Sequence, residues 1–201
     1  MKEGLNRNQK VIKRLFDLFF AFIGLLLCII PILILIAFAT ISTRKFGLYS
    51  QKRIGLHGKS FVMYKIRSMK KGDDSSVITL KNDPRITQFG KFIRDLKLDE
   101  LPQLWNVLMG EMSFVGPRPD VSGYADKLSG IDRVILCIRP GITGPATIKF
   151  KDEESLLAAQ RDPVTYNDEV IWKEKIEINK MYIKNWSLKS DINYILRTLF
   201  N

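Results

Sequence analysis

The stretch LFFAFIGLLLCIIPILILIAFATI, from Leu18 to Ile41, decides the fold. It runs for 24 residues without a charge, and a helix needs only about 20 apolar residues to cross the hydrocarbon of a bilayer. A secretory signal peptide fits poorly, because its apolar region is shorter and a small-residue cleavage site should follow it. The sequence therefore predicts a membrane-embedded helix near the N-terminus.

Pro31 lies near the middle of this stretch, where its missing N–H removes a backbone hydrogen bond and bends a helix. Basic residues flank the stretch on both sides, so the positive-inside tendency does not orient a single crossing. A bent helix that enters and leaves through the same membrane face fits both flanks. A plain span and a buried hairpin of a soluble protein stay open as alternatives. The flanking basic residues are Lys10, Lys13 and Arg14 before the stretch and Arg44, Lys45, Lys52 and Arg53 after it.

The whole chain has 201 residues and a formal net charge of +11. The length suits one domain, or one domain plus a membrane anchor, and we expect an anchor over residues 1–45 and a catalytic domain over residues 46–201. Nucleic acid, an anionic lipid surface or a phosphorylated substrate would each suit so much positive charge, and the apolar stretch favours the last two. Cys28 and Cys137 show no ligand spacing, and His57 has no Cys or His neighbour. We therefore expect reduced thiols and no zinc site.

The region after the apolar stretch is mixed in its local patterns. Residues 61–66 predict a strand. Residues 87–97 predict a helix with Thr87 as its cap, and a second helix is expected from Asp99 to Met109, where Pro102 falls in the first turn. The expected fold class is therefore a small mixed α/β domain, mostly helical with a short β-hairpin or sheet, next to the proline-bent membrane helix.

The remaining segments are read as loops and amphipathic helices. Pro and Gly, together with polar residues, predict loops over 71–85, 113–122 and 138–147. Residues 168–184 predict an amphipathic helix. The segment from 186 to 200 carries aromatic and aliphatic residues among Lys and Arg, so it either lies in the membrane interface or packs on the core.

Asp99 and Glu100 are adjacent acids at a predicted helix start. One reading is structural, because acids cap helices and complement the helix dipole. The other is chemical: a helix N-terminus offers free N–H groups to a phosphate, and an ionised Asp can attack phosphorus. Arg94, on the preceding helix, could neutralise phosphate charge. Both readings stay open from the residues alone.

Two stiff loops each hold one arginine. Pro117 and Pro119 enclose Arg118, and Arg139 begins the run Arg-Pro-Gly-Ile-Thr-Gly. A rigid loop with a single guanidinium suits phosphate recognition, although a surface arginine in a turn would look the same. The stretch from Gly55 to Ser60 ends like a phosphate-binding loop but is two residues too short.

Taken together, these segments resemble the monotopic bacterial phosphoglycosyl transferases, the sugar transferases that start lipid-linked glycan assembly. The resemblance spans nearly the whole chain and is most specific from residue 94 to residue 119. Its pieces are Lys13-Arg14 with Asp17, the proline-bent helix, Tyr64-Lys-Ile-Arg-Ser-Met69, Leu98-Asp-Glu-Leu-Pro-Gln-Leu-Trp-Asn-Val-Leu108, Gly116-Pro-Arg-Pro119, Arg139-Pro-Gly-Ile-Thr-Gly144 and Asn185-Trp-Ser-Leu188.

The resemblance implies roles for individual residues. Asp99 matches the nucleophile that attacks the β-phosphorus of a UDP-sugar and expels UMP, and Glu100 matches a partner that deprotonates or orients the acceptor. Magnesium is expected beside these two acids. Arg94 and Arg118 match arginines that hold phosphates or the nucleotide, and we place Lys65 and Arg139 in the same phosphate-binding group.

The resemblance also implies partners and a location. The expected partners are a UDP-sugar donor, a polyprenyl phosphate acceptor, anionic membrane lipids and downstream glycosyltransferases, and no nucleic acid. The expected place is the cytoplasmic face of a bacterial inner membrane, with the bent helix re-entrant and the chain a minimal catalytic form. Two competing readings are a basic, membrane-tethered nucleic-acid-binding module and a structural membrane protein.

The chain departs from the family pattern at two places. Ile30 precedes the bend proline, where family members often carry a Ser whose hydroxyl could cap a freed carbonyl. After Gly144 the sequence continues Pro-Ala-Thr, and the acidic run 152–154 is also unlike the commoner members. Because this region is expected to help choose the sugar, the identity of the sugar is left open.

Overall fold

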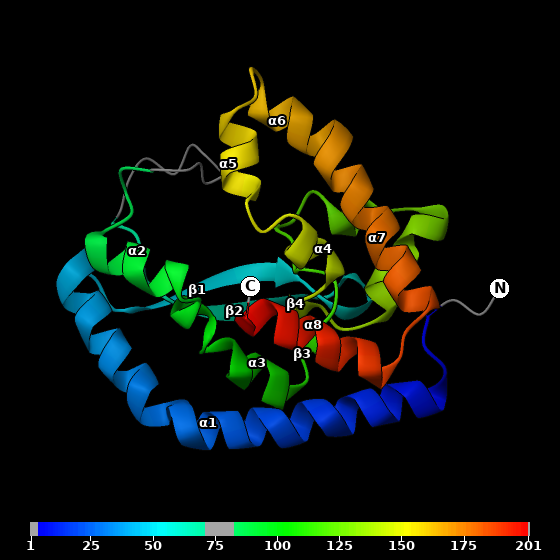
Figure 1. Cartoon of the computed structure of the whole chain (residues 1–201), viewed down its shortest axis with the longest axis horizontal. Helices are drawn as coiled ribbons and strands as arrows, with labels where there is room; N and C mark the ends of the chain where they lie inside the picture. The colour runs from blue at the N-terminus through cyan, green and yellow to red at the C-terminus, as the bar shows by residue number, and fades with distance from the viewer. Residues whose placement is uncertain (1–3, 71–82, 201) are drawn as a thin grey trace.

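Two small sheets and a larger set of helices make up the described residues, 4–70 and 83–200, of the computed structural model. Strands β1 (Leu48–Ile54) and β2 (Ser60–Ile66) form an antiparallel hairpin, and β3 (Ser113–Val115) pairs in parallel with β4 (Gly141–Thr143). Figure 1 shows helices around these strands. The expected mixed, mostly helical class is confirmed at this level, as is the strand predicted over 61–66.

Helix α1 (Arg7–Thr43) contains the whole apolar stretch in 37 residues. Figure 1 shows it bent in its middle and running along one side of the other elements. Pro31 lies inside α1 and explains a bend, because it has no N–H to donate to the carbonyl four residues earlier. Within the described residues, α1 is the one helix long and apolar enough to cross a membrane.

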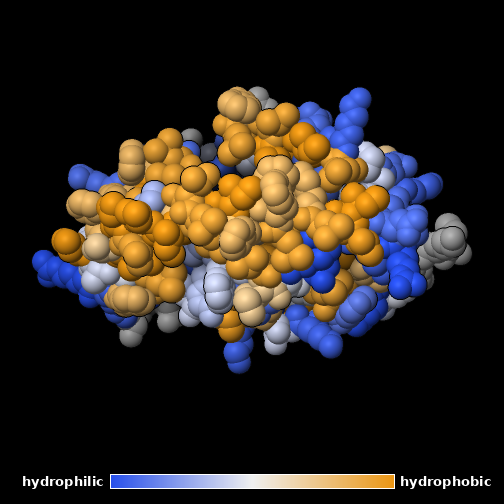
Figure 2. Space-filling view, turned by 90° about the horizontal axis from the view of Figure 1, so that it is seen from below, coloured by the Kyte–Doolittle hydropathy of each residue, from blue (hydrophilic) through white to orange (hydrophobic). Residues whose placement is uncertain are grey.

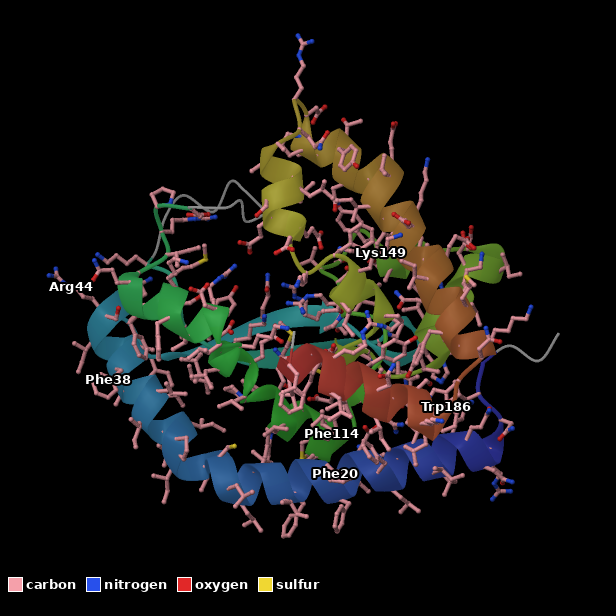
Figure 3. The ribbon with its side chains drawn as sticks, in the orientation of Figure 1. Phe20, Phe38, Arg44, Phe114, Lys149 and Trp186 are labelled. Atoms are coloured by element: carbon pink, nitrogen blue, oxygen red, sulfur yellow. The ribbon has the colours of Figure 1, made fainter. Side chains whose placement is uncertain are left out.

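Most apolar side chains of α1 are exposed. Ala21 and Ala39 are fully buried, because their methyl side chains let the helix approach its neighbours closely. Figure 2, seen from the α1 side, shows apolar side chains gathered over this face, and Figure 3 places Phe20 and Phe38 along the helix. An exposed apolar face of this extent marks an interaction surface. Its members include Val11, Leu15, Phe19, Phe22, Leu26, Leu27, Ile30, Leu33, Ile34 and Ile41.

Asn106 joins the hairpin to α3 (Gln103–Met109). Its fully buried amide donates to the carbonyl of Val62 at 2.7 Å and accepts from the N–H of Tyr64 at 3.2 Å. These bonds hold β2, the strand that carries Lys65, against α3. Strand β2 and helix α3, which begins shortly after the acid pair, are thereby fixed relative to each other.

Helix α2 (Gln88–Asp95) confirms the helix predicted over 87–97. The hydroxyl of Thr87 accepts a hydrogen bond from the N–H of Gly90 at 2.8 Å, as expected of an N-cap. Of the loop expected over 71–85, residues 71–82 lie outside the described residues.

The single helix expected from Asp99 to Met109 is wrong in its extent. A 3-10 turn, η2 (Leu98–Glu100), comes first, and α3 begins only at Gln103. The ring of Pro102 would clash with the carbonyl of Leu98 in a continuous α-helix. That carbonyl accepts instead from the N–H of Leu101 at 3.3 Å, which tightens the turn.

The loops expected over 113–122 and 138–147 contain regular structure that the Pro and Gly content hides. They include β3, β4 and helix α4 (Pro145–Lys149). The two backbones approach so closely that a Cβ on Gly141 would lie 2.1 Å from the N of Gly116. The glycines therefore permit the parallel pair here.

The C-terminal helices form an arch that returns to α1 (Figure 1). The helix predicted over 168–184 is confirmed as η5 (Asn167–Ile171), a π-helix, followed by α7 (Trp172–Lys184). Helix α8 (Leu188–Phe200) buries Asp191 and exposes Ile192, Leu196 and Leu199. One face of α8 thus packs on the core, and the other keeps the interfacial reading open. The remaining elements are η1 (Leu56–Gly58), η3 (Ala125–Lys127), η4 (Gly130–Cys137), α5 (Glu153–Ala158) and α6 (Pro163–Tyr166).

Candidate active site

Asp99 lies in the turn η2, and its side chain is only 7% exposed. The N-cap of η2 is Lys97 and that of α3 is Pro102, so Asp99 caps neither helix. No hydrogen bond from the described part of the chain reaches its carboxylate. The structural reading of Asp99 as a helix cap is therefore wrong, and its carboxylate is left available for chemistry.

Glu100, the next residue, is held by two basic side chains. Its Oε1 lies 2.8 Å from Nζ of Lys65 and 3.0 Å from Nη2 of Arg118. Burial alone would raise the pKa of Glu100, but the charges of Lys65 and Arg118 and their hydrogen bonds outweigh it and lower the pKa to about 2. Glu100 is therefore ionised at neutral pH and fixes both cations.

The pKa of Asp99 moves in the opposite direction. Burial of the side chain raises this pKa above its ordinary value, although the positive charge of Lys65 opposes the rise. Adjacent carboxylates whose pKa values are pushed apart can take different parts in one reaction. Within the described residues Asp99 is the acid without an ion pair, and Glu100 is the acid paired with Lys65 and Arg118.

Three separate elements bring cations to Asp99. Lys65 comes from β2, Arg94 from the last turn of α2, and Arg118 from the loop after β3. The charges of all three act on the carboxylate of Asp99. Arg94 also forms an ion pair with Glu154 of α5. Such a group of cations, two of them guanidiniums, suits the phosphates of a substrate.

Arg139 is the one predicted phosphate-binding residue that the structure does not bring to the acid pair. Its Nε donates to the carbonyl of Gly110, at the opposite end of α3, over 2.7 Å. It lies there beside Arg14, which donates to the carbonyls of Val107 and Leu108. A phosphate-binding role for Arg139 stays a prediction. If Arg139 has such a role, it binds phosphate at the C-terminal end of α3 and not beside the acid pair.

The acid pair suits a metal that is shared with a substrate. Magnesium in proteins is commonly bound by one or two carboxylates, with waters and substrate phosphates completing its six ligands. The carboxylate of Asp99 and Oε2 of Glu100 accept no hydrogen bond from the described residues. The described residues hold no group of three or more His, Cys, Asp or Glu that could hold a metal. Asp99 and Glu100 therefore fit Mg²⁺ only together with a phosphorylated ligand.

Several charged residues near the site were not predicted from the sequence to belong to it. Asp120 follows Pro119 directly, and burial raises its pKa to about 6 despite the nearby charges of Lys175 and Arg53. Arg53 donates to the carbonyl of Pro119 at 3.3 Å, and its buried Nε has no hydrogen-bond partner among the residues that the structure describes. The position of Asp120 directly after the Pro117–Pro119 loop could have indicated from the sequence that it lies near the site. Arg53 and Lys175 gave none, because tertiary packing alone brings them here.

Asp120→Asn is expected to stabilise the protein at neutral pH. The folded pKa of Asp120 lies above its ordinary value of 3.8, so the folded state loses stability as pH rises from about 4 to about 6. A neutral Asn avoids this loss, which amounts to at most about 3 kcal/mol. Thermal unfolding of both proteins in detergent across this pH range checks it. An Asn variant that is less stable than the parent at neutral pH would contradict it.

Comparison with known proteins identifies the family of this chain. Residues 8–201 match a family described as bacterial sugar transferase. A UDP-glucose:undecaprenyl-phosphate glucose-1-phosphate transferase of Klebsiella pneumoniae is 36% identical over 98% of this chain and 41% of that relative. The galactosyl transferase CpsE of Streptococcus agalactiae is 36% identical over 96% of this chain and 42% of its own length. The uncharacterized sugar transferase EpsL of Bacillus subtilis is 36% identical over 94% and 86%. The chain thus spans about two fifths of the first two relatives and most of the third.

Proposed function

The chain belongs to the bacterial sugar transferase family, and on this premise we propose that it moves a sugar 1-phosphate from a UDP-sugar to undecaprenyl phosphate. The observation that carries the proposal is Asp99, a buried carboxylate without a hydrogen-bond partner among the described residues and within reach of three cationic charges. The printed name of the Klebsiella relative supports the classes of donor and acceptor.

Two in-line displacements at one phosphorus account for the reaction. A carboxylate oxygen of Asp99 attacks the β-phosphorus of the UDP-sugar, and the bond from that phosphorus to the bridging oxygen breaks, which releases UMP. A phosphate oxygen of undecaprenyl phosphate then attacks the same phosphorus and frees the carboxylate. Neither step requires a net transfer of a proton.

The cations around Asp99 neutralise the charge that the donor brings. Lys65 and Arg118 are held ready by Glu100, which lies within 3.0 Å of both. A carboxylate with a pKa of about 2 is a weak base. We therefore assign Glu100 the orientation of these cations rather than removal of a proton. Arg94 would exchange its ion pair with Glu154 for a donor phosphate.

Magnesium fits this reaction at Asp99 and Glu100. When bound, it supplies charge neutralisation where the phosphates of the donor meet the two carboxylates. Glu100 uses Oε1 for Lys65 and Arg118, which leaves Oε2 for a metal.

The exposed apolar face of α1 supports a place at a membrane. We propose that α1 enters and leaves the cytoplasmic face of a bacterial inner membrane, with its bend at Pro31. Cysteine labelling at Asn8 and at Ser50, substituted singly after both native cysteines are replaced, should report the same side of the membrane. Labelling from opposite sides would contradict the re-entrant arrangement.

Release of UMP tests the proposed reaction directly. The full chain, in detergent with Mg²⁺ and undecaprenyl phosphate, is offered a panel of UDP-sugars that includes UDP-glucose and UDP-galactose. We expect UMP from at least one donor. UDP release in place of UMP would mean that the other bond of the diphosphate breaks, and it would overturn the proposal. So would no release from any donor.

A further inference from the structure

A cavity of about 540 Å³ lies beside the first turns of α1, away from the acid pair. Its walls come from the start of α1, from η1 and from the chain that enters β4. Helix α3 separates it from the active site: Asp99 precedes α3, while the residues of the cavity contact its C-terminal end. Seven helical residues span roughly 10 Å, so the two places are distinct.

The cavity is lined by five Lys and Arg side chains and by one acidic side chain, Asp17, whose charge acts on Arg14 and Lys13. Within residues 4–70 and 83–200, Arg7, Lys10, Arg14 and Arg139 take part in no ion pair. Lys13 also lines the cavity, but its charge is met by Asp191 at 2.6 Å. The basic side chains of the cavity therefore outnumber the acids that meet them, and this excess of positive charge favours an anionic ligand.

Two of these cations are held side by side in fixed positions. A Cβ built on Gly110 would lie 3.2 Å from Nη2 of Arg14 and 3.9 Å from Nε of Arg139. Both guanidiniums donate to carbonyls at the C-terminal end of α3, which explains their anchoring. The anchoring uses only Nε of Arg139. The outer nitrogens, Nη1 and Nη2, have no hydrogen-bond partner in the described residues and are available to a ligand.

The rest of the cavity is apolar and continues into the exposed face of α1. Leu5, Val11, Leu15 and Ile138 are among its lining residues. Val11 and Leu15 are also 51% and 62% exposed, on the same helix as the large apolar face. A free inorganic anion would gain nothing from these contacts, whereas an amphiphile with a phosphate would use both parts.

We propose that this cavity binds the phosphate headgroup of an anionic membrane phospholipid. Nη1 and Nη2 of Arg139 donate two parallel hydrogen bonds to the phosphate oxygens. Lys10 and Arg7 add positive charge from the first turns of α1. The glycerol and first acyl carbons lie along Leu15 and Val11. The bound lipid then seats the N-terminal arm of α1 at the headgroup level of the membrane.

Native mass spectrometry of the full chain tests this binding without any sugar donor. Protein is taken from micelles that contain phosphatidylglycerol or phosphatidylcholine, and one retained phosphatidylglycerol is expected. Lys10→Gln is expected to lower its retention by about fivefold. The matched control, Lys45→Gln, removes the same charge from an exposed residue just beyond the other end of α1 and should change little. Arg139→Lys keeps the charge but loses the fork, and should also lower retention.

Each other outcome would overturn the lipid assignment. Equal losses in Lys10→Gln and Lys45→Gln would indicate diffuse attraction to an anionic surface. Equal retention of phosphatidylglycerol and phosphatidylcholine would show that the cavity does not select the anionic headgroup. If calorimetry shows that inorganic phosphate binds while the lipid stays bound, the phosphate site and the lipid site are different. Loss of the retained lipid in Arg118→Gln, which removes a cation beside Asp99, would place the lipid in the active site. Because Lys10 is exposed, its variant stays informative even if Arg139→Lys fails to fold.

Discussion

Asp99→Asn is expected to lower UMP release by at least about a thousandfold, as removal of a covalent nucleophile does elsewhere. An amide keeps the size of the side chain but cannot attack phosphorus. The carboxylate accepts no hydrogen bond from the described residues, so the exchange breaks no contact of the fold. The rate of UMP release, measured with the best donor of the panel, checks the prediction.

A matched control separates chemistry from general damage. Asp95 lies four residues earlier, is exposed, and pairs with Lys91 within α2 at 3.0 Å. Asp95→Asn should therefore leave UMP release nearly unchanged. Asp99→Asn should also unfold at the same temperature as the parent, or higher, because its removed charge is disfavoured by burial. Turnover at the parent rate in Asp99→Asn would refute its role as nucleophile.

Asp191→Ala is expected to destabilise the protein by about 3–5 kcal/mol, because it leaves a buried cation without its partner. Asp191 is 1% exposed and accepts from Nζ of Lys13 at 2.6 Å, from the hydroxyl of Tyr182 at 2.6 Å and from Nε1 of Trp186 at 3.0 Å. These bonds join the start of α1 to α7 and α8, and Figure 3 shows Trp186 near the junction of these helices. Chemical unfolding in detergent measures the loss.

A double variant distinguishes the buried charge from simple loss of packing. Lys13→Met with Asp191→Leu removes both charges and keeps apolar volume, so it should recover much of the stability that Asp191→Ala loses. Asp95→Ala, which breaks an exposed pair, should cost less than about 1 kcal/mol. A loss for Asp191→Ala as small as that for Asp95→Ala would show that the network does not hold α1.

Local sequence patterns predicted part of the secondary structure correctly. Thr87 was recognisable as a cap because its hydroxyl precedes an apolar stripe, and the strand at 61–66 stood out by composition. The sheet β3–β4 was missed because it joins residues 28 apart through glycines at 116 and 141, which local patterns assign to loops. Pairing of distant segments has no local signature.

The candidate site divides in the same way. Asp99, Glu100, Arg94, Arg118 and Lys65 were named from their motifs, and the structure brings their charges together. Arg139 was grouped with them because a motif gives residue type and not position, and the fold places it at the far end of α3. The buried ion pair of Asp191 was not predicted from the sequence, because its partner Lys13 lies 178 residues away.

Mass spectrometry of the peptide that bears Asp99 tests the covalent step most directly. The protein is incubated with Mg²⁺ and a UDP-sugar that supports turnover, without acceptor, and is then quenched and digested. We expect the mass of one sugar phosphate on Asp99, lost again when undecaprenyl phosphate is added before the quench. A peptide that stays unmodified, or an adduct carried by any other residue, would contradict Asp99 as the group that becomes phosphorylated.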